Sequence, residues 1–103
     1  MLKFVGDLCF ADWHFDLGFG IGKMLQKGID PLAHCPIKSN DIWIGNMECV
    51  ISETSENKGI DAKYFRTREN DFLNSSHCQI YAVANNHIMQ HGHSAYINTL
   101  SAI

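Results

Sequence analysis

Three short apolar runs along the chain each end abruptly in polar side chains. They cover residues 2–5, 41–46 and 79–84, and short apolar stretches of this kind are typical of buried β-strands. A strand buried on both faces is normally apolar throughout, so the polar residues at these ends need a separate explanation. The pattern therefore predicts three strands whose polar last residues belong to a functional site.

The polar residues at the three strand ends are carboxylates, amides and an imidazole. They are Asp7, Asn46, Glu48, Asn85, Asn86 and His87. In an open α/β sheet, ligands bind outside the carboxyl ends of the strands, so we expect these side chains to meet at one pocket. Oxygen and imidazole donors together suit a divalent metal such as Zn²⁺, Mn²⁺ or Fe²⁺. The pattern thus indicates a mixed oxygen and nitrogen metal site.

The segments between the predicted strands carry weaker signals. Residues 21–27 favour a short helix that ends at Gly28, a residue suited to a left-handed cap. Residues 52–63 are almost entirely polar, which predicts a solvated loop at the mouth of the sheet. His91 and His93 flank a glycine before the last helix, where an exposed turn is expected.

Two further helices are predicted in the second half of the chain. One runs to residue 73 with Thr67 as its cap and buries Phe72 and Leu73. The other spans residues 92–103 and presents one apolar face. This face consists of Tyr96, Ile97, Leu100 and Ile103. Alternating strands and helices predict an α/β fold, and so few elements leave sheet surface exposed unless another segment or chain covers it. Self-association into a homo-oligomer is therefore an open alternative.

Composition narrows the class of protein. The chain has 103 residues, enough for one small domain, and its net charge of −3 provides no basic patch for nucleic acid. The four cysteines form no C-x-x-C pair, which argues against a zinc ribbon and favours reduced thiols. There is no leader-like start and no apolar stretch long enough to span a membrane. We therefore expect a cytoplasmic protein without a membrane segment.

Several ordered motifs together resemble one known family. They are Gly6-Asp7, Asn46-Met47-Glu48, Phe65-Arg66, Asn85-Asn86-His87, Gly92 and Thr99-Leu100. In this order and at these separations they resemble the CapA-type poly-γ-glutamate (capsule) biosynthesis family, a branch of the calcineurin-like metallophosphoesterase superfamily. The resemblance covers nearly the whole chain.

The resemblance implies a layered αββα metallophosphoesterase-like sandwich and a divalent-metal-dependent phosphoesterase-like hydrolase. The metal ligands would be Asp7, Asn46, Glu48 and Asn86, with Mn, Fe or Zn as the ion. His87 would be the catalytic acid. Arg66 and Asn85 would bind a small or polymeric anionic substrate. Two alternatives stay open: Arg66 can pair with an acidic residue, and Asn85 can bond to nearby backbone.

Two departures from the family pattern matter. The family usually has Asp where this chain has Gln90, and the superfamily completes its metal site with histidines farther along the chain. Residues 1–103 are therefore predicted to be a single domain that forms the N-terminal portion of a longer one. His91, His93 and an Asp12–His14 pair are possible substitute ligands. A non-catalytic polyanion-binding or assembly module and an inactive fragment are the alternatives to an enzyme.

Overall fold

The computed structural model describes residues 1–11, 21–36, 38–73 and 77–103. The possible Asp12–His14 ligand pair lies outside the described residues.

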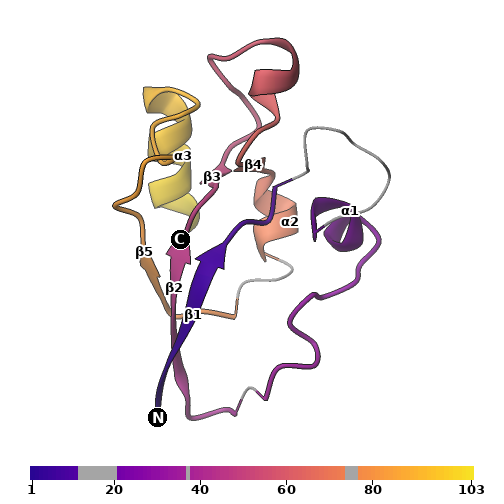
Figure 1. Ribbon diagram of the computed structural model, residues 1–103, viewed down its shortest axis with the longest axis vertical. Coiled ribbons are helices and arrows are strands. Elements are labelled where there is room, and N and C mark those ends of the chain that lie inside the picture. The colour runs from indigo at the N-terminus through magenta and orange to yellow at the C-terminus, as the bar shows by residue number, and fades with distance from the viewer. Residues whose placement is uncertain (12–20, 37, 74–76) are drawn as a thin grey trace.

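A parallel sheet of three strands rises from the N-terminus at the bottom of the view toward the helices (Figure 1). Its strands are β1 (Leu2–Leu8), β2 (Ile42–Met47) and β5 (Ile80–Ala82), in the order β1-β2-β5. A second, two-stranded parallel sheet pairs β3 (Val50–Ile51) with β4 (Arg66–Thr67). The predicted α/β class and the three predicted strands are confirmed. The layered αββα sandwich that the resemblance implies stays a prediction.

Strand β1 continues beyond its predicted end at Gly6. Its pairing with β2 shifts register between Phe4 and Asp7, and it resumes with Asp7 opposite Asn46 and Leu8 opposite Met47. An irregularity of this kind re-aims the side chains that follow it. As a result Asp7 is exposed and stands level with Asn46, while Leu8 enters the core.

Two short helices lie next to the sheet and contact each other: α1 (Ile21–Gln26) and α2 (Glu69–Leu73). Gly28 has φ of 73°, which confirms the predicted left-handed position after α1. The core cluster consists of Leu8, Phe10, Leu25, Met47, Cys49, Ile51 and Phe72. The prediction that Leu73 is buried is wrong, since 56% of it is exposed. Neighbouring residues on a helix point in different directions, so this short helix turns only Phe72 inward.

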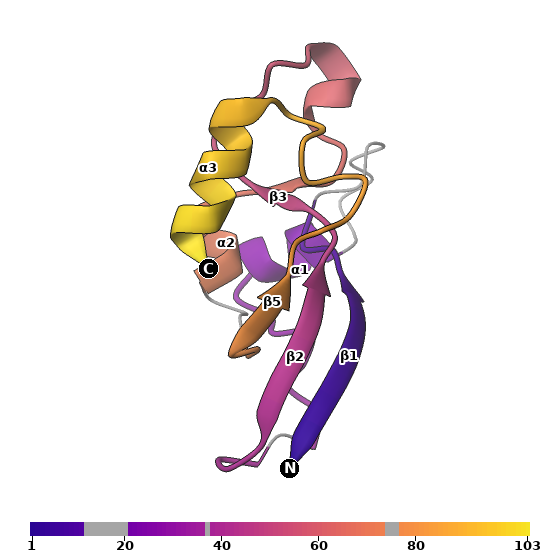
Figure 2. The ribbon, with the colours of Figure 1, turned by 90° about the vertical axis from the view of Figure 1, so that its left-hand side faces the viewer.

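Helix α3 (His93–Ala102) packs against β3, but with a different face from the predicted one (Figure 2). Its buried residues are Ala95 and Thr99, whereas Leu100 is 41% exposed. The Thr99 hydroxyl accepts a hydrogen bond from the Ile51 amide at 2.9 Å and donates one to the Ala95 carbonyl at 2.8 Å. Small side chains let the helix approach β3 closely enough for this contact, which leaves the apolar face of α3 outside.

The start of α3 is tied to the polar loop by a buried histidine. His91 is 1% exposed, so the expectation of an exposed turn is wrong for this residue. Its Nε2–H donates to the Tyr64 carbonyl, and its Nδ1 accepts from the Ser55 hydroxyl at 2.7 Å. The polar stretch also contains the 3-10 helix η1 (Gly59–Ala62). Burial lowers the pKa of His91, which keeps the ring neutral.

One face of the three-stranded sheet remains open to solvent, as the sequence predicts. Leu2 pairs with Ile42, and Phe4 pairs with Ile44, which also pairs with Ile80. Paired residues of parallel strands point to the same side, so these side chains share one face. Phe4 is 74% exposed and Ile80 is 50% exposed. No helix in the described part of the chain is long and apolar enough to cross a membrane.

Candidate functional site

The carboxyl ends of β1 and β2 bring two carboxylates to one amide. The Asn46 Nδ2 donates to Asp7 Oδ1 at 2.8 Å and to Glu48 Oε2 at 2.6 Å. The two acceptor oxygens therefore lie no farther apart than the sum of these distances. This arrangement follows from the register, because Asp7 and Asn46 are paired and Glu48 comes two residues later.

The end of β5 joins the same group of side chains through Asn85. Its Nδ2 donates to the Met47 carbonyl at 2.7 Å and to Asn46 Oδ1 at 3.3 Å. Its Oδ1 accepts from the His87 amide at 3.0 Å. Asn85 thus links the ends of β2 and β5 and shapes the turn that carries His87. These contacts fit the structural alternative for Asn85, and its substrate-binding role stays a prediction.

The His87 ring is fixed on three sides. It stacks on Phe65 with ring centroids 3.7 Å apart and planes at 16°. Its Nδ1 lies 2.7 Å from Gln90 Oε1, and its Nε2 lies 3.1 Å from Asn86 Nδ2 and 3.5 Å from Glu48 Oε1. The aromatic stack and the two amide contacts together leave the ring little freedom to turn.

These contacts select one neutral tautomer of His87. The Gln90 carbonyl oxygen can only accept, so Nδ1 carries the proton, and Nε2 then accepts from the Asn86 amide. Glu48 Oε1 lies 3.5 Å from the same Nε2 atom. In this arrangement His87 can act as an acid only after Nε2 takes up a second proton.

We call these connected residues the strand-end cluster: Asp7, Asn46, Glu48, Asn85, Asn86 and His87. Arg66, the remaining predicted site residue, makes its hydrogen bonds elsewhere. Its Nε and Nη1 donate to the carbonyls of Ala62 at 2.6 Å and Ser52 at 2.9 Å. Its substrate-binding role stays a prediction. Sequence reasoning missed Phe65 and Gln90 as partners of His87, although the three-residue spacing of His87 and Gln90 on a turn was a usable signal.

Two cysteines lie close to the cluster carboxylates in sequence: Cys49 directly follows Glu48, and Cys9 lies two residues after Asp7. Hydrogen bonding with the Cys49 thiol lowers the pKa of Cys9 to about 7. The same contact with Cys9, together with burial, raises the pKa of Cys49 well above its usual value. Cys49 Sγ also accepts from the Phe10 amide at 3.4 Å. The sequence alone indicates only ordinary reduced thiols here, because the proximity of Cys9 and Cys49 depends on the pairing of β1 with β2.

The donor chemistry of the strand-end cluster partly fits a divalent cation. Asp7 and Glu48 supply carboxylates, which are ligands that hard cations accept. Asn46 directs its Nδ2 at these carboxylates and Asn86 directs its Nδ2 at His87, so each amide would have to turn before its oxygen could bind the same cation. Among the described residues, however, no three His, Cys, Asp or Glu side chains lie close enough to hold one ion. These residues would therefore provide only part of the coordination sphere.

The comparisons with known proteins agree with the motif order. The sequence model described as "Bacterial capsule synthesis protein PGA_cap" matches residues 2–103. The chain belongs to this family. Searches of the curated proteins and of the solved structures returned no match. Membership in the capsule synthesis family confirms the resemblance drawn from the ordered motifs.

Proposed function

We propose that this chain contributes the strand-end part of a metal-dependent, phosphoesterase-like hydrolase site used in capsule synthesis. The observation that carries the proposal is the hydrogen-bonded convergence of Asp7, Asn46 and Glu48 from the ends of β1 and β2. Membership in the capsule synthesis family supports the biological setting. The proposal includes the layered sandwich, in which further sheet would cover the exposed apolar face.

Asp7, Asn46, Glu48 and Asn86 would hold the cation, with Mn, Fe or Zn as candidates. A divalent ion bound there would lower the pKa of a coordinated water and neutralise charge on a phosphoryl group. Two carboxylates with neutral amides leave coordination positions for water and for an anionic substrate. The two carboxylates of the cluster would attract such a cation to the edge of the sheet.

His87 would act next to this position as a proton donor. Phe65 and Gln90 hold its ring so that Nε2 points toward Glu48. Once protonated at Nε2, the imidazolium can donate its proton to the oxygen of a leaving group, an effect typically worth about 10²–10⁴-fold in rate. A positioned acid of this kind suits cleavage of a phosphoester better than simple binding.

Hydrolysis of bis(p-nitrophenyl) phosphate in the presence of Mn²⁺ tests the proposal. We expect turnover that EDTA abolishes and that Asp7→Asn, Glu48→Gln and His87→Ala each reduce by about 10²-fold or more. Asp61→Asn is the matched control, because Asp61 is an exposed acid in η1 outside the cluster. Turnover that is absent with Mn²⁺, Fe²⁺ and Zn²⁺, or equal in all four variants, would contradict the proposal.

The second candidate is a non-catalytic module that binds an anion. The observation that favours it is a separate cavity lined by Lys63, Arg66 and Arg68. In that case anion binding would survive EDTA and would not depend on Glu48 or His87. Anion binding that survives EDTA, in a protein that shows no metal-dependent turnover of bis(p-nitrophenyl) phosphate, would favour this candidate over the hydrolase.

A further inference from the structure

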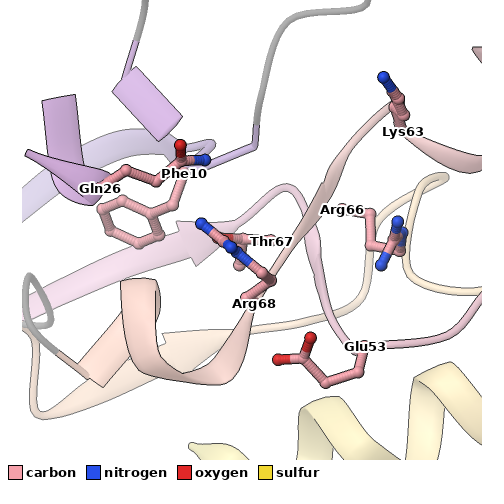
Figure 3. A pocket seen from close by; sticks show the side chains of 7 residues that line it. All are labelled: Phe10, Gln26, Glu53, Lys63, Arg66, Thr67 and Arg68. Carbon is pink, nitrogen blue, oxygen red and sulfur yellow. The ribbon is translucent and has the colours of Figure 1, made fainter. Parts of the chain in front are cut away.

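A cavity of about 260 Å³ lies beside the segment that leads into β4 (Figure 3). Its lining residues are Phe10, Gln26, Glu53, Lys63, Arg66, Thr67 and Arg68. Four of them come from residues 63–68, while Phe10 and Gln26 close the other side (Figure 3). None of these seven belongs to the strand-end cluster, so the cavity is a distinct feature of the molecule.

The cavity lining is positively charged, whereas the chain as a whole is negatively charged. The protein carries a net charge of −3, yet three cationic side chains and only one carboxylate line the cavity. Arg68 is neutralised by Asp71, whose Oδ2 lies 2.8 Å from Nη2. Lys63 and Arg66 have no such acidic partner among the described residues, so Glu53 alone opposes their charges. The cavity therefore keeps a positive excess after its internal ion pair is counted.

Arg66 is prepared to bind an anion. Its Nε and Nη1 donate to the carbonyls of Ala62 and Ser52, at 2.6 and 2.9 Å. Carbonyl groups are neutral, so these bonds fix the guanidinium in place without cancelling its charge. Nη2 and the second hydrogen of Nη1 remain as donors, and a planar fork of this kind matches an oxyanion. Because folding already fixes this side chain, little further conformational entropy is lost when an anion binds.

Thr67 gives a second, independent indication. It is 4% exposed, and its hydroxyl has no hydrogen-bond partner among the described residues. A buried hydroxyl without a partner is unfavourable, and such groups are uncommon in folded proteins. Thr67 lines the cavity, so a turn of its side chain about χ1 would let the buried hydroxyl donate to an oxygen that also meets Arg66.

We propose that this cavity is a binding site for a small oxyanion, a carboxylate or a phosphate, held by Arg66 with help from Lys63 and the Thr67 hydroxyl. Glu53 opposes the ligand and limits its affinity. The site does not depend on metal binding or hydrolysis at the strand-end cluster. The proposed anion site is therefore compatible with an enzyme and with a binding module.

An NMR titration of the ¹⁵N-labelled protein tests the proposal at constant ionic strength. The probes are propionate, inorganic phosphate and propionamide, the neutral isostere of propionate. We expect propionate or phosphate to shift the Arg66 Nε–H and Thr67 amide signals saturably, while propionamide does not. The tighter of the two anions identifies the ligand class.

Four variants sharpen the test. Lys63→Gln should weaken anion binding roughly twofold to fivefold, and Glu53→Gln should tighten it by a similar factor, because both side chains are exposed. Thr67→Val keeps the side-chain shape and should weaken binding roughly threefold without lowering stability. Lys38→Gln, an exposed lysine that does not line this cavity, is the matched control. Equal shifts with propionamide, or unchanged affinity in both Lys63→Gln and Thr67→Val, would overturn the proposal.

Discussion

Replacing Asn46 by Asp probes the strand-end cluster most sharply. The substitution keeps the shape of the side chain, but it removes the two N–H donors that reach Asp7 at 2.8 Å and Glu48 at 2.6 Å. It also introduces a third carboxylate between two others. The lost hydrogen bonds and the added repulsion both destabilise the folded state, so the fall in stability should be large for a residue close to the surface.

The magnitude follows from the geometry. A hydrogen bond to a charged group contributes about 1.5–3 kcal/mol when it is shielded from water, and Asp7 is exposed, so we take about 1 kcal/mol for each lost bond. Repulsion between carboxylates at such contact distances adds on the order of 1 kcal/mol when solvent screens it. The free energy of unfolding should therefore fall by about 3 kcal/mol. For a domain of this size the Tm should fall by on the order of 10 °C.

Thermal unfolding followed by circular dichroism measures the effect. Asn70→Asp is the matched control, because Asn70 is an exposed residue of α2. Mn²⁺ should raise the Tm of Asn46→Asp more than that of the wild type, since the third carboxylate is also an additional ligand. A Tm for Asn46→Asp within about 3 °C of the control would refute the reasoning, because Asn46 would then not hold the two carboxylates together.

Three further predictions concern the surroundings of the cluster. Thr99→Val should lower the free energy of unfolding by about 1–3 kcal/mol in urea denaturation, because it leaves the Ile51 amide without its acceptor; an unchanged midpoint would count against this. His91 has a pKa below its ordinary value of 6.5, so the unfolded chain binds a proton that the folded chain does not, and stability should fall as the pH drops below about 6.5. His91→Gln should flatten this pH profile, and an equally steep profile would contradict the assignment. Iodoacetamide at pH 7 should label Cys9 before Cys78, as read by mass spectrometry, because burial raises the pKa of Cys78 while that of Cys9 is about 7; Cys49→Ala should remove the difference.

The strands and the contacts of the strand-end cluster followed from the sequence because they rest on local signals. An apolar run that stops at Asp7, Asn46 or Asn85 specifies both a strand and the edge at which its polar end lies. Parallel strands then bring those ends together, whatever the details of the loops. The roles of these side chains in metal binding and catalysis stay predictions.

Other features depend on tertiary contacts that no local pattern carries. The buried face of α3 was mispredicted because hydrophobic spacing favoured Leu100 and Ile103, whereas close packing on β3 selected Ala95 and Thr99. Likewise, the sequence gives no sign that Arg66 is anchored by two carbonyls from separate segments. The burial of His91 depends on the course of the polar loop, which brings Ser55 and Tyr64 to the ring.

Paramagnetic broadening by Mn²⁺ in the ¹H–¹⁵N spectrum tests the metal site most directly. The spectrum reports each backbone amide separately, so it locates a bound ion without relying on activity. We expect substoichiometric Mn²⁺ to broaden the signals of Asp7, Asn46, Glu48, Asn86 and His87 first, and Glu48→Gln to weaken this selectivity. Broadening centred elsewhere on the chain, or no selective broadening at all, would contradict a metal site at the strand-end cluster.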